Sequence, residues 1–178
     1  MTLEPPRLLE AFRFEAERVL VPLDLARCSM GALALANQFA RRFDARVTLL
    51  YVVPHPGRER DSQPDGLEFR QAEACLRRLG DRHLRSTVTF SARVRAGLPA
   101  AEILAEITDG RADLLVLPLH HRTLLRRLLR RRPYGQTSRD VIAGARCQTF
   151  ICELMGEVNW FKRWRNGHGS LRAVEGEN

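Results

Sequence analysis

The chain has 178 residues, of which 44% are hydrophobic and 28% are charged, with 29 Lys and Arg against 21 Asp and Glu. This length and composition are typical of one compact domain, and they exclude wholesale disorder, a collagen-like repeat and a disulfide-dense scaffold. There is no secretory signal core and no apolar run long enough to cross a membrane, so we expect a cytoplasmic protein with no membrane span. We also expect its cysteines to be reduced and packed as small apolar side chains. They are Cys28, Cys75, Cys147 and Cys152.

The positive charge is concentrated in one segment. Seven arginines and no acid lie between Arg122 and Arg139, so the rest of the chain carries a net charge of only +1. Paired leucines alternate with paired arginines over 124–131, which predicts a short amphipathic helix. Three interpretations stay open: a solvated face whose leucines pack on the domain, an anion site for phosphates, polyphosphate or RNA, and a docking surface for an acidic protein or an anionic membrane. The candidate contacts for an acidic protein or polyanion are Arg126, Arg127, Arg130, Arg131 and Arg132.

Apolar runs alternate with helical periodicities along the chain. Runs rich in β-branched residues predict buried strands over 18–22, 47–53, 115–119 and 149–152, and an alternating pattern predicts a strand over 87–94. Apolar residues at helical spacing predict helices over 28–43, 67–84 and 138–145, and a further helix that begins at Pro99 and ends at Asp109 and Gly110. This alternation predicts an α/β fold, with a three-layer, doubly wound, mostly parallel five-stranded sheet between helices on both faces.

The predicted fold also locates a ligand site. In an open parallel sheet, ligands lie outside the carboxyl ends of the strands, where the strand order reverses. Asp24 would lie there as a ligand contact, or it would only cap a turn or helix. His120 and His121 are adjacent, so they point in different directions in regular structure, and no carboxylate accompanies them; we predict no metal site. No catalytic triad or acid pair is evident, so we predict no catalytic residues. Three segments should meet at this edge: 22–24, 52–54 and 117–122.

Over roughly Phe14 to Cys152 the chain resembles the universal stress proteins. The segments that carry the resemblance are RVLVPLD at 18–24, RFDARVTLLYVV at 42–53, Gly97 with the proline-containing helix after it, ADLLVLP at 112–118 and ARCQTFIC at 145–152. The resemblance implies a Rossmann-like fold of the adenine-nucleotide alpha-hydrolase type, over 14–152, between an N-terminal extension (1–13) and a tail (153–178). The role of the tail, with Trp160, Phe161 and Trp164, stays open. The resemblance also implies a cytoplasmic homodimer formed through the last strand, here Thr149, Phe150, Ile151 and Cys152.

Members of this family that bind ATP carry Gly-x-x-Gly directly after the fourth strand, followed nine residues later by Gly-Ser or Gly-Thr. The glycines let the backbone approach the phosphates, whose oxygens accept hydrogen bonds from amides. Here Pro118 and His121 stand at the two glycine positions, and Gly135-Gln136 matches the last pair only after four extra residues, so the motif is degenerate. Asp24 matches the family's residue near the adenosine, and Val52 matches one that lines the adenine pocket. The candidate ligand-binding residues are Pro22, Leu23, Asp24, Val52, Leu117, Pro118, His121, Arg122, Gly135, Gln136, Thr137 and Ser138.

These observations together predict a non-catalytic stress-response or regulatory protein that acts through dimerisation and binding. We expect ATP, or another adenine nucleotide, to bind weakly or not at all. Two alternatives stay open. One is an ATP-binding member of the family with arginines at the phosphates and slow hydrolysis, and the other is an accessory subunit that docks to an acidic partner, RNA or an anionic membrane through 122–139.

Overall fold

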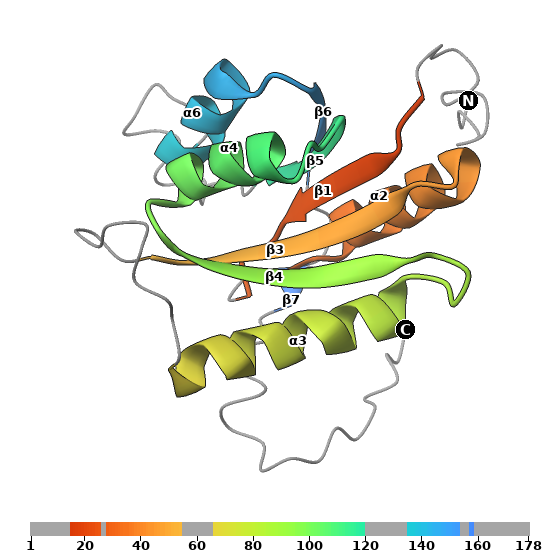
Figure 1. Ribbon diagram of the computed structural model, residues 1–178, viewed down its shortest axis with the longest axis horizontal. Helices are drawn as coiled ribbons and strands as arrows, with labels where there is room; N and C mark the ends of the chain where they lie inside the picture. Colours follow the sequence, from red (N-terminus) through yellow and green to blue (C-terminus); the bar gives the residue numbers. More distant parts are fainter. Residues whose placement is uncertain (1–14, 26–27, 55–65, 120–134, 154–156, 159–178) are drawn as a thin grey trace.

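The computed structural model describes residues 15–25, 28–54, 66–119, 135–153 and 157–158. Five strands form one sheet in the spatial order β4-β3-β1-β5-β6, and every neighbouring pair is parallel (Figure 1). This arrangement confirms the predicted doubly wound α/β sheet. The strands are β1 (Arg18–Pro22), β3 (Arg46–Pro54), β4 (Phe90–Gly97), β5 (Leu114–Leu119) and β6 (Gln148–Glu153).

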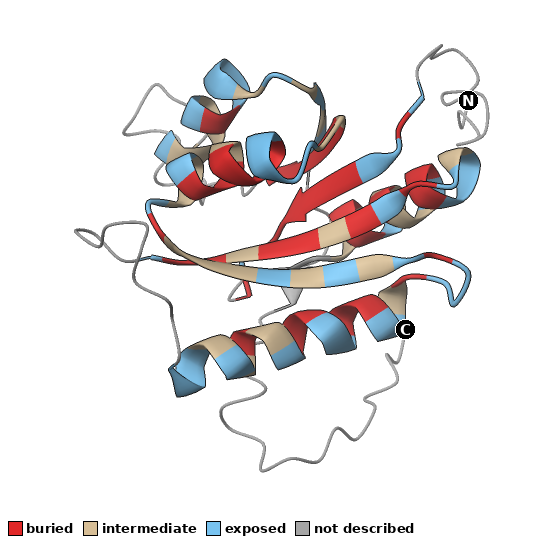
Figure 2. Cartoon of the chain, viewed as in Figure 1, coloured by how far each residue is buried: buried red, intermediate tan, exposed pale blue. Residues whose placement is uncertain are grey.

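Helices cover both faces of the sheet, as the alternation of elements predicts. On one face lie α2 (Met30–Phe43) and α3 (Leu67–His83), and on the other lie α4 (Pro99–Asp109) and α6 (Gln136–Gly144) (Figure 1). Each helix turns an apolar stripe toward the sheet, so there are two cores. Phe39 and Leu49 belong to the core under α2 and α3, and Leu50 belongs to the core under α4 and α6. Figure 2 shows these buried stripes along β1, β3 and the helix faces toward the sheet.

Several predicted boundaries differ from the observed ones by one to three residues, and backbone contacts explain two of these differences. The strand predicted over 87–94 begins at Phe90 instead, because the amide of Val88 is used in a turn, where it donates to the carbonyl of Arg85 at 2.8 Å. The helix predicted from Cys28 begins at Met30. The two residues before it form a short strand, β2 (Cys28–Ser29), which pairs antiparallel with β7 (Glu157–Val158).

Some predictions fall on residues that the structure does not describe. They include the amphipathic helix over 124–131 and the tail aromatics Trp160, Phe161 and Trp164. Within the described part of the chain, Cys75 is buried, Cys147 and Cys152 are half-buried, and all three are free thiols. None of the described helices is long and apolar enough to cross a membrane.

Candidate functional site

A pocket of about 260 Å³ lies at the carboxyl ends of β1, β3 and β5, beside the N-terminal turns of α4 and α6. From β1 the chain continues to β3 on one side of the sheet and later to β5 on the other, so the strand order reverses here. The pocket therefore lies where ligands bind in open parallel sheets. It is lined by Pro22, Leu23, Asp24, Leu50, Tyr51, Val52, Pro54, Pro99, Ile103, Leu117, Pro118, Thr137 and Ser138.

The structure brings most of the predicted site residues together. Gly135 and Gln136 lie directly before the lining residues of α6 but are not part of the lining. His121 and Arg122 lie outside the described residues. The role of all of these residues in binding stays a prediction. Those that line the pocket are Pro22, Leu23, Asp24, Val52, Leu117, Pro118, Thr137 and Ser138.

The loop after β1 is held in place by contacts on both sides of Asp24. The amide of Leu23 donates to the carbonyl of Leu50 on β3 at 2.8 Å, and the side chain of Leu25 is fully buried. Asp24 itself is exposed, so these two anchors present its carboxyl group at the rim of the pocket. Because α2 begins only at Met30, Asp24 is not the N-cap of that helix, which removes helix capping as an explanation for this residue.

The pocket has an apolar side and a polar side. Leu50, Val52 and Ile103 are buried in the core under α4 and contribute apolar surface. Thr137 and Ser138, in the first turn of α6, contribute hydroxyl groups next to the amides that a helix leaves unpaired at its N-terminus. Such a lining fits a flat apolar ring with polar substituents.

Tyr51 is a lining residue that the sequence reasoning missed. Burial raises the pKa of its phenol, and the negative charges of Asp24 and Glu68 and the nearby Cys75 raise it further. Tyr51 points to the opposite face of β3 from Val52, yet both line the pocket because the pocket surrounds the end of the strand. Its place directly before Val52 in an apolar run is the sequence signal that could have identified it.

A cluster of charged side chains fixes α4 against β4, next to the pocket. Arg95 of β4 donates from Nε to Oε2 of Glu106 at 2.6 Å, from Nη2 to Oδ2 of Asp109 at 2.9 Å, and from Nη1 to Oε2 of Glu102 at 3.4 Å. Burial lowers the pKa of Arg95, but these hydrogen bonds outweigh that effect and the pKa is raised. Gly97 leaves room for Glu102, since a Cβ there would lie 2.9 Å from its Oε1. The cluster therefore positions the helix that supplies Ile103.

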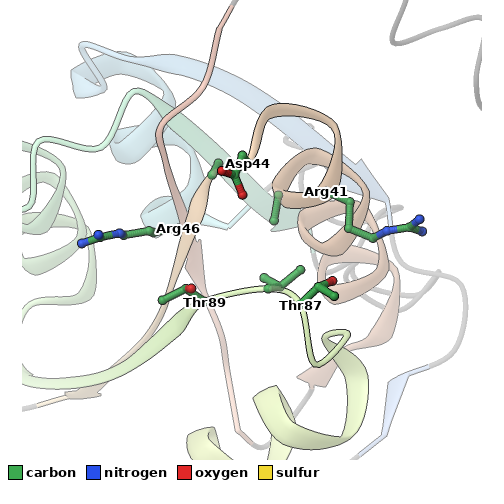
Figure 3. A pocket seen from close by; sticks show the side chains of 8 residues that line it. Arg41, Asp44, Arg46, Thr87 and Thr89 are labelled. Atoms are coloured by element: carbon green, nitrogen blue, oxygen red, sulfur yellow. The ribbon is translucent and has the colours of Figure 1, made fainter.

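A second pocket, of about 400 Å³, lies at the opposite, amino end of the sheet (Figure 3). Asp44, Thr87 and Thr89 line it together with Arg41 and Arg46. The two arginine side chains leave in opposite directions, so they do not converge on a common ligand. In the described part of the chain, no group of three or more His, Cys, Asp or Glu is placed to hold a metal ion.

The edge strand β6 carries the predicted dimer contacts. Phe150 and Cys152 face inward, and the ring of Phe150 lies 4.7 Å from that of Phe39, centroid to centroid. Ile151 points to the other side of the strand and is 47% exposed. Ile151 is therefore the most exposed apolar side chain of this strand, and Phe150 and Cys152 are half-buried.

Comparison with known proteins gives a consistent result. A family model described as the universal stress protein family matches residues 15–153. Among solved structures, the chain is similar to a universal stress protein in complex with cAMP, with 19% identity and a TM-score of 0.58 over 80% of this chain and 100% of that one. It is also similar to the universal stress protein UspA from Lactobacillus plantarum, with 21% identity and a TM-score of 0.51 over 78% and 99% of the two chains. At these identities the likeness to the solved structures shows the fold. No curated protein sequence matches the chain significantly.

Proposed function

The chain belongs to the universal stress protein family, and from that premise we propose that it is a non-catalytic regulatory protein whose pocket weakly binds an adenine nucleoside or nucleotide. The observation that carries the proposal is the pocket at the reversal of the strand order, where Asp24 and Val52 lie beside the hydroxyls of α6. The solved relative in complex with cAMP supports an adenine ligand. Most of the binding energy would come from the adenosine end, which the apolar lining can cover.

The phosphate end of the ligand is held less well in this proposal. Pro118, at the position of the family's first glycine, is buried on β5 and has no amide hydrogen to donate. A nucleotide would therefore lose one of the backbone donors that a glycine loop supplies. We infer that adding phosphates to adenosine changes its affinity little.

Calorimetric titration with adenosine, AMP and Mg-ATP tests the proposal directly. The three dissociation constants should agree within about threefold, because a shared adenosine end gives a shared free energy of binding. Asp24→Ala should weaken all three by about tenfold, the loss expected for one charge-assisted hydrogen bond. Asp81→Ala is the matched control, since it removes an exposed carboxylate from the last turns of α3, at the other end of the sheet. Absence of binding at millimolar concentrations of all three ligands would end the proposal.

One observation favours a second candidate, an ATP-binding protein with arginines at the phosphates. Residues 120–134 join the end of β5 to the start of α6, and the pocket residues Pro118 and Thr137 lie near the two ends of this segment. Six of the seven clustered arginines belong to it. This candidate predicts that ATP binds more than about tenfold tighter than AMP, and that the difference shrinks as salt rises. The same titration therefore separates the two candidates.

We also propose that the protein forms a homodimer through β6. No strand among the described residues pairs with the outer side of β6, and the exposed Ile151 offers apolar surface beside that edge. Thr149, Phe150 and Cys152 would contribute backbone to the interface. Light scattering at high micromolar concentration tests this proposal, and a monomer there would contradict it.

A further inference from the structure

The opposite edge of the sheet, formed by β4, is long and regular. Its ladder with β3 runs without interruption from Val47 opposite Phe90 to Pro54 opposite Gly97, and no proline or bulge interrupts β4. Within the described part of the chain, no strand pairs with its outer side. Proteins usually protect such an edge, because its unpaired backbone groups are a template for another strand.

The register identifies which backbone groups point outward. The amide of Val47 donates to the carbonyl of Thr89 at 3.0 Å, so Thr89 directs its backbone polar groups toward β3. Successive residues of a strand direct these groups to opposite sides. The amides and carbonyls of Ala92 and Val94 therefore face away from β3, at the open edge.

The side chains of β4 form two rows with different chemistry. On the α3 side, Phe90, Ala92 and Val94 are half-buried, so part of this apolar row stays exposed. On the other side, Ser91 and Arg93 are exposed. Arg93 is the freer of the two cations on this side, because its side chain is 61% exposed and its Nε lies 3.6 Å from the carboxylate of Glu106, whereas Arg95 contacts three carboxylates.

We propose that the outer edge of β4 docks an extended segment of a partner protein in which apolar residues alternate with acidic ones. Such a segment would add a sixth strand, with its backbone bonded to Ala92 and Val94. Its apolar residues would cover the exposed part of the row on the α3 side. An acidic residue on the other side would pair with Arg93, whose guanidinium keeps exposed donors for a second carboxylate.

A second copy of this chain fits the same edge less well. Pairing β4 with β4 would place Arg93 of both copies on one face of the joined sheet, where like charges repel. Repulsion between the two copies of Arg93 therefore disfavours self-association, and the exposed Arg93 itself favours a partner with an acidic residue at that position.

Fluorescence anisotropy with labelled peptides tests the proposal. The probes have eight residues, the length of β4, and alternate Val with Glu, Val with Ser, or Val with Lys. We expect saturable binding of the Val-Glu peptide, with a dissociation constant on the order of 100 μM or tighter, and no binding of the Val-Lys peptide. Arg93→Ala should weaken the Val-Glu peptide about fivefold and leave the Val-Ser peptide unchanged. Arg41→Ala, on α2, is the matched control and should change neither.

A backbone variant tests strand addition itself. Ala92→Pro removes only an outward amide, which an edge strand tolerates, and it should abolish binding of the Val-Glu peptide. Its thermal unfolding shows whether it is folded. If it is not, hydrogen exchange of Ala92 and Val94 in the unaltered protein decides instead, because a docked strand must slow both amides.

The proposal would be overturned by equal binding of the Val-Glu and Val-Lys peptides, or by no binding of any peptide. It would also be overturned by unchanged hydrogen exchange, or by a folded Ala92→Pro variant that binds the Val-Glu peptide normally. A loss of oligomer in Ala92→Pro would overturn it too, because it would mean that β4 pairs copies of the chain.

Discussion

Replacing Arg95 by leucine should destabilise the fold more than any other single change of a charged residue in the described sheet. Arg95 is the shared partner of Glu102 and Glu106, whose side chains are only 10% and 4% exposed. Leucine keeps much of the apolar contact of the side chain but donates no hydrogen bond. Two carboxylates would then stay buried without the guanidinium that compensates the cost of removing them from water.

The geometry sets the size of the effect. Removing one partner of a buried ion pair costs about 3 to 5 kcal/mol. Here Arg95 is 24% exposed, and Arg93 remains 3.6 Å from Glu106, so both solvent and a second cation reduce the loss. The contact with the exposed Asp109 adds about 0 to 1 kcal/mol. We expect a loss of about 2 to 3 kcal/mol, which lowers the unfolding temperature by about 4 to 12 °C in a domain of this size.

Urea unfolding followed by far-ultraviolet circular dichroism measures this loss. Arg77→Leu is the control, because Arg77 also contacts a glutamate, Glu73, at 2.6 Å, but with side chains 63% and 43% exposed. It should cost less than about 0.5 kcal/mol. Adding Glu106→Gln to Arg95→Leu should recover part of the stability, since it removes one buried charge. Equal losses for Arg95→Leu and Arg77→Leu, or no recovery, would refute the reasoning.

The other predictions concern single positions. Gly97→Ala should cost about 1 to 3 kcal/mol in the same urea assay, because the glycine has φ +147° and the new Cβ would lie 2.9 Å from Oε1 of Glu102; a neutral result would mean that Glu102 moves freely. Ile151→Arg should convert the proposed dimer to monomer in light scattering without lowering the unfolding temperature of the monomer, and an unchanged mass would place the interface elsewhere. Burial raises the pKa of the Cys75 thiol, so less thiolate is present near pH 8, and its alkylation followed by mass spectrometry should be at least about tenfold slower in the folded protein than in urea. Equal rates would show that the helix opens readily there.

The order and type of the main elements could be predicted from the sequence because each depends on local patterning. Continuous apolar runs predict strands buried on both faces, and helical spacing places Ala36 and Phe39 on one buried face of α2. The site at the carboxyl ends of the strands could be predicted from the same topology. In a parallel sheet these ends lie at one edge, even when the strands are far apart in the sequence. The segments 22–24 and 52–54 were identified in that way, and the resemblance to the family then singled out Asp24 and Val52 within them.

Some of the errors occur where a partner distant in sequence decides the outcome. The start of α2 at Met30 depends on pairing with β7, which is not visible in the local pattern. The start of β4 at Phe90 follows a local turn, in which the amide of Val88 donates to the carbonyl of Arg85, and the alternating pattern does not signal that turn. Glu102 and Glu106 are spaced like solvent-facing helix residues, and only the arginine on the neighbouring strand explains their burial. Tyr51 was missed because alternation assigns it to the other face of the strand from the pocket residue Val52.

The short β2–β7 pairing has a consequence for spectroscopy. It ties the segment beyond the family match to the loop that follows Asp24. Both tryptophans of the chain, Trp160 and Trp164, come shortly after β7, and the domain contains none. Tryptophan emission is therefore an intrinsic signal of the tail alone, with no contribution from the core. If adding a nucleotide changes that emission, the pocket loop and the tail are coupled, and no attached label is needed to detect it.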